Sequence, residues 1–322
     1  MLEKLLEIDQ VTLDFSDESK LLLNITIGFI MFGVALELKF DDFKKLFDNP
    51  KSVIIGIISQ FLLMPLLTFV LALTLKSYIT PTVGLGMILV ASCPGGNVSN
   101  FISSLARGNV ALSVSLTAFS SFAGLLLTPL NFTLWGSLFI KYYTLGNEAL
   151  TIPTLELSVL DVLVTIFLII GIPLLVGISC NYRFPKFTEK VLVPIKQFSI
   201  LAFFGMIGVL FTKNLDLFLM YIKYIFLIVL AHNLLAILMG YNFAKILKLE
   251  FKERKTIAIE TGIQNSGLAL ALLFNPLIFP QEMALGGMAF IAAWWGIWHI
   301  IAGLTIAGIW TGFKLKPDTI SE

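Results

Sequence analysis

The sequence predicts an all-α polytopic membrane protein with nine transmembrane helices. Of its 322 residues, 57% are hydrophobic and only 13% are charged, which is far too apolar for a soluble domain. A spanning helix needs about 20 mainly apolar residues, and nine stretches of this chain meet that requirement. Two of the nine carry polar and flexible residues in their middle, which is typical of helices interrupted within a membrane. We therefore expect residues 1–322 to form a single membrane unit.

The nine predicted spans are separated by short connections, apart from one long outer loop at 138–154. They lie near residues 21–38, 53–75, 82–106, 109–137, 155–180, 191–212, 220–245, 255–277 and 284–311. The charged segment 1–20 precedes the first span, and Leu2, Leu5 and Leu6 share one helical face within it. We expect this segment to form a short helix at the membrane interface.

The distribution of Lys and Arg predicts how the chain is oriented. With the N-terminus outside, the inner side of the membrane collects sixteen of the basic residues and the outer side six. Cytoplasmic loops are enriched in basic residues, so the N-terminus is expected outside the cell membrane and the C-terminus in the cytoplasm.

Several functional classes are disfavoured by composition. A net charge of +1 provides no basic surface for a nucleic acid. Cys93 and Cys180 lie in different spans without a Cys-x-x-Cys spacing, so neither a disulfide framework nor a zinc site is indicated. No Ser/His/acid or His/Glu zinc pattern converges with the polar breaks, so we do not expect an enzyme.

The two interrupted spans occupy matching positions in two halves of the chain. The third span contains SCPGGNVSN (92–100) and the eighth contains ETGIQNSG (260–267), and Asn100 and Asn265 are 165 positions apart. This spacing suggests two repeats, with four spans in 21–137 and five in 155–312. The step from the third span to the eighth is odd, so the repeats have opposite topology. Paired interrupted spans of this kind indicate the binding site of a secondary transporter.

The residues at the breaks favour a cation beside an anion. A broken helix frees carbonyl and N–H groups, which is tolerated at membrane depth only where they line a site. Freed carbonyls favour cations and half-helix N-termini favour anions. Glu260 near the bilayer centre costs about 2.5–3.5 kcal/mol, so it requires a partner or a function. The surrounding oxygen donors suit a hard cation such as sodium better than a softer metal.

Three motifs together resemble the bile acid:sodium symporter family. They are PGGNVSN, ARGNVALSVSLT and ETGIQNSGLALAL, and the resemblance extends from IMFGVALELK (30–39) to the last span. It implies two inverted repeats, two crossed discontinuous helices, and a core domain that moves against a panel domain in alternating access. It also implies two sodium ions behind the crossing and an organic anion in front of it. Segment 1–20 occupies the place of the first of ten spans in fuller members.

The resemblance also implies specific ligands. One sodium site takes Ser99, Asn100, Ser113, Thr117 and Glu260. The second takes Gln60, Glu260, Thr261, Ile263 and Gln264, with Thr261 and Ile263 acting through main-chain carbonyls. Ser113 and Thr117 are four residues apart, so their hydroxyls share a helix face. Glu260 therefore belongs to both sites, and its expected partner is sodium.

The expected substrate is a bile acid or a smaller carboxylate or sulfonate anion, flanked by Asn97, Asn265 and His299. Asn97 stands where the family leads us to expect a smaller hydroxyl residue. We expect a monomeric symporter in the lipid bilayer that moves two sodium ions with each anion. The first alternative is a cation/proton antiporter of similar fold, which requires ionisable groups at the crossing, where Glu260 is the one candidate. A receptor that binds without transport stays open.

Overall fold

Helices make up the regular secondary structure of the described part of the chain. The computed structural model describes residues 2–9, 25–26, 28–33, 35–36, 45–145, 164, 167–213, 215–275, 278–279 and 285–313. Within these residues the prediction of an all-helical protein is confirmed. In this described part of the chain, four helices are long and apolar enough to cross a membrane, namely Pro50–Thr74, Val110–Thr144, Leu219–Ile246 and Gly286–Thr311.

One succession of elements occurs twice along the chain: a long helix, a broken helix and another long helix. The first occurrence consists of α4 (Pro50–Ile58), a π-helical turn η2 (Ser59–Leu63), α5 (Met64–Thr74), the broken pair α6 (Pro81–Ser92) and α7 (Val98–Leu105), and α8 (Val110–Thr144). The second consists of α12 (Leu215–Ile246), the broken pair α13 (Phe251–Gly262) and α14 (Ser266–Leu273), and α15 (Gly286–Thr311). Both predicted interruptions are therefore present in the structure.

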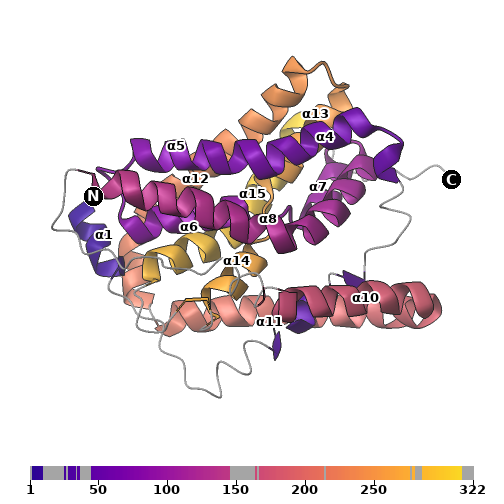
Figure 1. The fold of residues 1–322 in the computed structure, drawn as a ribbon, viewed down its shortest axis with the longest axis horizontal. Coiled ribbons are helices and arrows are strands. Elements are labelled where there is room, and N and C mark those ends of the chain that lie inside the picture. The colour runs from indigo at the N-terminus through magenta and orange to yellow at the C-terminus, as the bar shows by residue number, and fades with distance from the viewer. Residues whose placement is uncertain are drawn as a thin grey trace.

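The remaining described helices include one further layer. They are α1 (Leu2–Asp9), η1 (Lys45–Phe47), the π-helical turn η3 (Phe167–Gly171), α10 (Ile172–Arg183) and α11 (Pro185–Lys213). Helices α10 and α11 lie side by side (Figure 1), and Leu174 and Ile178 of α10 belong to the same buried apolar cluster as Ala118 of α8. The predicted spans 21–38 and 155–180 fall partly outside the described residues, and the described parts of both are helical.

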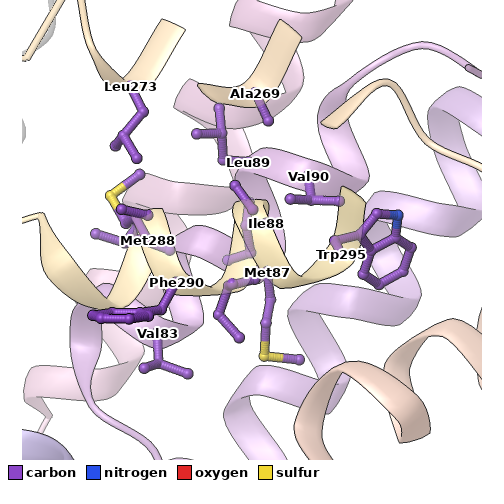
Figure 2. Packing of buried hydrophobic residues seen from close by; sticks show 14 of the residues in the cluster. Val83, Met87, Ile88, Leu89, Val90, Ala269, Leu273, Met288, Phe290 and Trp295 are labelled. Carbon is purple, nitrogen blue, oxygen red and sulfur yellow. The ribbon is translucent and has the colours of Figure 1, made fainter. Parts of the chain in front are cut away.

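Helices α6, α14 and α15 enclose the main hydrophobic core. Met87 and Ile88 of α6 are fully buried beside Met288 and Trp295 of α15. Figure 2 shows these side chains, with Leu273 of α14 above them. The helices approach closely because small residues line the contact: a Cβ atom at Gly86 would lie 2.7 Å from the Cα of Met288. This packing holds α6 against the first half of α15.

Helix α8 is longer than predicted. The sequence prediction ended this span at 137 and began the outer loop at 138, whereas the helix continues to Thr144. Phe139 is fully buried against Gly84 of α6, and the Tyr143 hydroxyl donates to the Ile79 carbonyl at 3.0 Å. These aromatic contacts stabilise two further turns, although Lys141 and Tyr142 lower their hydropathy.

The N-terminal helix α1 packs against α6, α12 and α15. Leu5 and Ile8 are fully buried, whereas Leu6 is 42% exposed, so the packed face differs from the Leu2, Leu5 and Leu6 face. The Asp9 carboxylate accepts hydrogen bonds from the hydroxyls of Thr80 and Thr82 at the start of α6. The interfacial placement of segment 1–20 stays a prediction, because the structure contains no lipid boundary.

We expect the docking of α1 to strengthen as the pH falls. Burial raises the pKa of Asp9 above its ordinary value of 3.8, although hydrogen bonds from Thr80 and Thr82 oppose this shift. Between 3.8 and the raised pKa the docked state binds more protons than the undocked state, so its stability decreases as the pH rises. Hydrogen exchange of residues 2–9, corrected for intrinsic rates, should slow at low pH. Asp9→Asn should remove this pH dependence, and an unchanged dependence in that variant would contradict the assignment.

Candidate functional site

The breaks in the two discontinuous helices pair with each other. The Gly96 N–H donates to the Ile263 carbonyl and the Asn265 N–H donates to the Pro94 carbonyl, each at 2.8 Å. Gly95 and Gln264 form an isolated antiparallel bridge at this point. The pairing satisfies main-chain groups that the breaks expose, which a membrane interior requires. It also brings the polar side chains of both breaks to one place.

Glu260 is surrounded by hydroxyl groups. It lies on the last turn of α13 and is 4% exposed. Its Oε1 accepts hydrogen bonds from Ser99 and Ser113, and Thr117 Oγ1 lies 3.3 Å from Oε1 and 3.2 Å from Oε2. In the described part of the chain no basic side chain acts on this carboxylate.

The hydroxyls reach Glu260 from two other elements. Ser99 lies on the first turn of α7, whereas Ser113 and Thr117 lie one turn apart on α8. Thr117 Oγ1 also lies 3.1 Å from Asn100 Oδ1, so the five residues of the first predicted sodium site are contiguous. Gly95 permits this approach, because a Cβ atom there would lie 2.8 Å from Glu260 Oε2.

Hydrogen bonds link three residues of the second predicted sodium site, Gln60, Thr261 and Gln264. Gln60 Nε2 donates to Gln264 Oε1 at 2.7 Å and to the Cys93 carbonyl at 2.9 Å. Gln264 Nε2 donates to the Thr261 carbonyl at 2.8 Å. The Ile263 carbonyl accepts from Gly96 in the bridge described above, which leaves this oxygen a second lone pair.

Gln60 provides an acceptor that the protein itself leaves unused. Its Oε1 is buried without a hydrogen-bond partner among the described residues, although buried polar atoms are normally paired. An amide oxygen of this kind is a donor that fits a hard cation. The other side chains of this group and of the Glu260 cluster also contribute oxygen atoms, which suit sodium better than a transition metal.

The three predicted substrate residues are less closely connected. Asn97 and Asn265 stand at the N-termini of α7 and α14, directly after the paired breaks. Asn265 Oδ1 caps α14 by accepting from the Leu268 N–H at 3.0 Å. His299 of α15 is 5% exposed, and its Nδ1 has no hydrogen-bond partner within the described residues. None of the hydrogen bonds described here links His299 to either asparagine.

Sequence reasoning missed several residues that support the site. Asn233 of α12 donates to the Gly262 carbonyl at 2.7 Å, where α13 ends. The Ser59 hydroxyl lies 2.7 Å from Thr261 Oγ1, which itself donates to the Ile257 carbonyl. Asn233 and Ser59 are polar and fully buried. A polar residue within an otherwise apolar span was the sequence signal that could have identified them.

Comparison with known proteins identifies the family. Residues 24–220 match the model of the Sodium Bile acid symporter family, which covers more than half of the chain. The chain belongs to the sodium bile acid symporter family. Members of this family are transporters, so the prediction that the chain is not an enzyme is confirmed.

Three relatives illustrate the range of this symporter family. An uncharacterised sodium-dependent transporter of Bacillus subtilis, YocS, is 34% identical over 93% of this chain and 86% of its own length. A probable chloroplastic sodium/metabolite cotransporter of rice is 30% identical over 85% of this chain and 64% of its own length. A sodium-dependent organic anion transporter of rat is 29% identical over 92% of this chain and 75% of its own length. The chain thus spans less than two thirds of the rice protein.

Proposed function

We propose that this protein is a sodium-coupled symporter of an organic anion, and that two sodium ions enter with each anion. The observation that carries the proposal is the buried Glu260 carboxylate, which is surrounded by hydroxyls and amides and lacks a basic partner among the described residues. A buried charge of this kind marks an ion pathway in membrane proteins. The Bacillus and rat relatives, which are named as sodium-dependent transporters, support the same conclusion.

The two proposed sodium sites share Glu260. The first comprises Ser99, Asn100, Ser113, Thr117 and Glu260, and the second comprises Gln60, Glu260, Thr261, Ile263 and Gln264. One carboxylate between two cations reduces their mutual repulsion, which is strong at low dielectric. Each ion then favours binding of the other through the carboxylate that they share. The occupancy of one site is thereby coupled to that of the other.

Alternating access is the proposed means of transport. The repeated succession of long, broken and long helices supports two inverted repeats, whose broken helices cross at the site. In this proposal α4 to α8 and α12 to α15 form the core domain, and the layer of α10 and α11 belongs to the panel domain. In the same proposal nine spans leave the termini on opposite sides of the cell membrane, and the distribution of Lys and Arg favours an outer N-terminus and a cytoplasmic C-terminus. We further propose that the protein acts as a monomer.

Anion uptake should be driven by sodium and by voltage. Two sodium ions carry two positive charges and a monoanion carries one negative charge, while Glu260 stays with the protein. Each inward cycle then moves one net positive charge, so an inside-negative potential of 100 mV contributes about 2.3 kcal/mol to accumulation. The measurement is uptake of a panel of radiolabelled carboxylates and sulfonates into proteoliposomes, with sodium or potassium outside and imposed potassium-diffusion potentials.

Two outcomes of that experiment contradict the proposal. Equal anion uptake in sodium and in potassium would rule out sodium coupling. Sodium-driven uptake that does not depend on the membrane potential would rule out a ratio of two sodium ions to one monoanion. A cation/proton antiporter instead predicts that an imposed sodium gradient moves protons across the membrane without any added anion, which an enclosed pH dye detects.

We expect Asn265→Ala to weaken anion binding while preserving sodium binding. Asn265 stands at the N-terminus of α14, and the positive end of a helix dipole favours an anion. The anion's Kd should rise about tenfold, which corresponds to about 1.4 kcal/mol, and sodium should still raise the Tm. Asn109→Ala is the matched control, because Asn109 Oδ1 also accepts from an N–H three residues later at 3.0 Å. Loss of sodium stabilisation in Asn265→Ala would contradict this assignment and show that Asn265 contributes to sodium binding.

A further inference from the structure

The π-helical turn η2 (Ser59–Leu63) presents Gln60 to the second proposed sodium site. In this turn the Met64 N–H donates to the carbonyl of Ser59, five residues earlier, rather than to that of Gln60. A π-helical turn inserted in an α-helix occurs frequently at functional sites. The inference below rests on the proposed function and asks what holds this turn in place.

Pro65 deprives the turn of a main-chain donor. Proline has no N–H, so Pro65 donates neither to Phe61, four residues earlier, nor to Gln60, five residues earlier. The second π-helical turn, η3 (Phe167–Gly171), likewise ends two residues before a proline, Pro173. The repetition indicates that these prolines favour the π-helical geometry.

Asn131 supplies the donor that Pro65 lacks. Its Nδ2 lies 3.0 Å from the Phe61 carbonyl oxygen and donates to it across the interface between α8 and η2. The amide is oriented in turn by Trp135, one helical turn later, whose Nε1 lies 3.3 Å from Asn131 Oδ1. A side chain from another helix thereby satisfies a carbonyl that a membrane interior cannot leave unpaired.

We propose that Asn131 is a positioning residue for the second sodium site and acts through the Phe61 carbonyl on the side chain of Gln60. Phe61 directly follows Gln60 in the π-helical turn, and its carbonyl belongs to the peptide that joins it to Leu62. The Asn131 hydrogen bond therefore holds the turn of main chain that carries the Gln60 side chain. That side chain already makes two hydrogen bonds, to Cys93 and Gln264. Its remaining Oε1 is the buried acceptor without a partner among the described residues, and it is the atom offered to sodium.

The test is a sodium titration of the thermal stability of the full-length protein in detergent, with sodium chloride replacing potassium chloride at constant ionic strength. Asn131→Leu keeps the approximate volume and removes the donor. The sodium concentration at half-maximal stabilisation should rise about tenfold, at the lower end of the effect of losing a group that orients a metal ligand. Asn131→Gln, which retains an amide donor, should stay closer to the wild type.

Two further variants make the result specific. Trp135→Phe removes the Nε1 donor but keeps an aromatic ring. Its sodium concentration at half-maximal stabilisation should therefore also rise, but by less than in Asn131→Leu. Asn242→Leu is the matched control, because Asn242 is an exposed residue of α12 whose Nδ2 bonds to Leu238 of its own helix at 2.8 Å. Its midpoint should equal that of the wild type.

A purely structural role for Asn131 predicts a different pattern. Asn131→Leu would then lower the Tm equally in both salts and leave the sodium midpoint unchanged, which overturns the inference. If Asn131→Leu does not fold, an unchanged midpoint in Trp135→Phe overturns it. Equal effects of Gln and Leu at position 131 also contradict it, because the donor then has no role. Absence of sodium stabilisation in the wild type would instead contradict the proposed function.

Discussion

Glu260→Gln should abolish nearly all sodium-driven uptake. Glutamine keeps the size and one acceptor for Ser99 and Ser113, but it removes the negative charge between two cations. Leaving a buried ion without its counter-charge costs about 3–5 kcal/mol. The sodium concentration for half-maximal uptake should therefore rise at least about a hundredfold. Any uptake that persists should depend on sodium with a lower apparent order, because at least one ion is lost.

Glu253→Gln is the matched control for this variant. Glu253 lies on the same helix, α13, is 5% exposed, and accepts hydrogen bonds from Ser52 and Asn49 near the beginning of α4. It also forms the capping box of α13 with Glu250. Its loss should lower the Tm in both salts while the order of sodium dependence is retained. A fully active Glu260→Gln variant would make Glu260 a structural residue.

Gly95→Ala should reduce uptake severely without changing a sodium ligand. A Cβ atom at this position would lie 2.8 Å from Glu260 Oε2, so the carboxylate must move away from its hydroxyl partners. The φ angle of Gly95 is outside the left-handed region, so the backbone itself accepts alanine. Overpacking costs about 1–3 kcal/mol, which corresponds to roughly tenfold or more in sodium affinity. Uptake titrated with sodium in proteoliposomes measures the shift.

Gly136→Ala provides the comparison for Gly95→Ala. A Cβ atom at Gly136 of α8 would lie 3.4 Å from the Leu85 side chain, which is an ordinary van der Waals contact. This variant should transport like the wild type. Equal sodium dependence in Gly95→Ala and the wild type would show that Glu260 tolerates displacement, and would weaken its role as a shared ligand.

The two interruptions could be predicted from the sequence, because polar residues such as Glu260 and Gln264 stand out within apolar stretches. The two sets of sodium ligands came from the resemblance to the family, and they stay a proposal. The pairing of Gly96 with Ile263 was not predictable in the same way, because it joins segments that are far apart in the chain. The extension of α8 to Thr144 depends on Phe139 and Tyr143 packing against α6, which hydropathy does not report.

The supporting amides were missed for a related reason. Asn131 and Asn233 form no motif with their partners, since both donate to main-chain carbonyls, of Phe61 and Gly262. A carbonyl carries no sequence signature. Pro65 was the available signal for the first of these contacts, because the absence of its N–H shows that a carbonyl four residues earlier requires another donor.

The most direct test of a sodium site at Glu260 is the Tm of the detergent-solubilised protein in sodium and in potassium. Sodium that binds the folded state adds about 2.7 kcal/mol of stability at a hundredfold excess over its Kd. The wild type should therefore melt at a higher temperature in sodium chloride than in potassium chloride at equal ionic strength, and Glu260→Gln should lose most of that difference. Equal Tm values for the wild type in the two salts, or the same sodium-dependent increase in Glu260→Gln, would contradict the assignment of Glu260 as the shared sodium ligand.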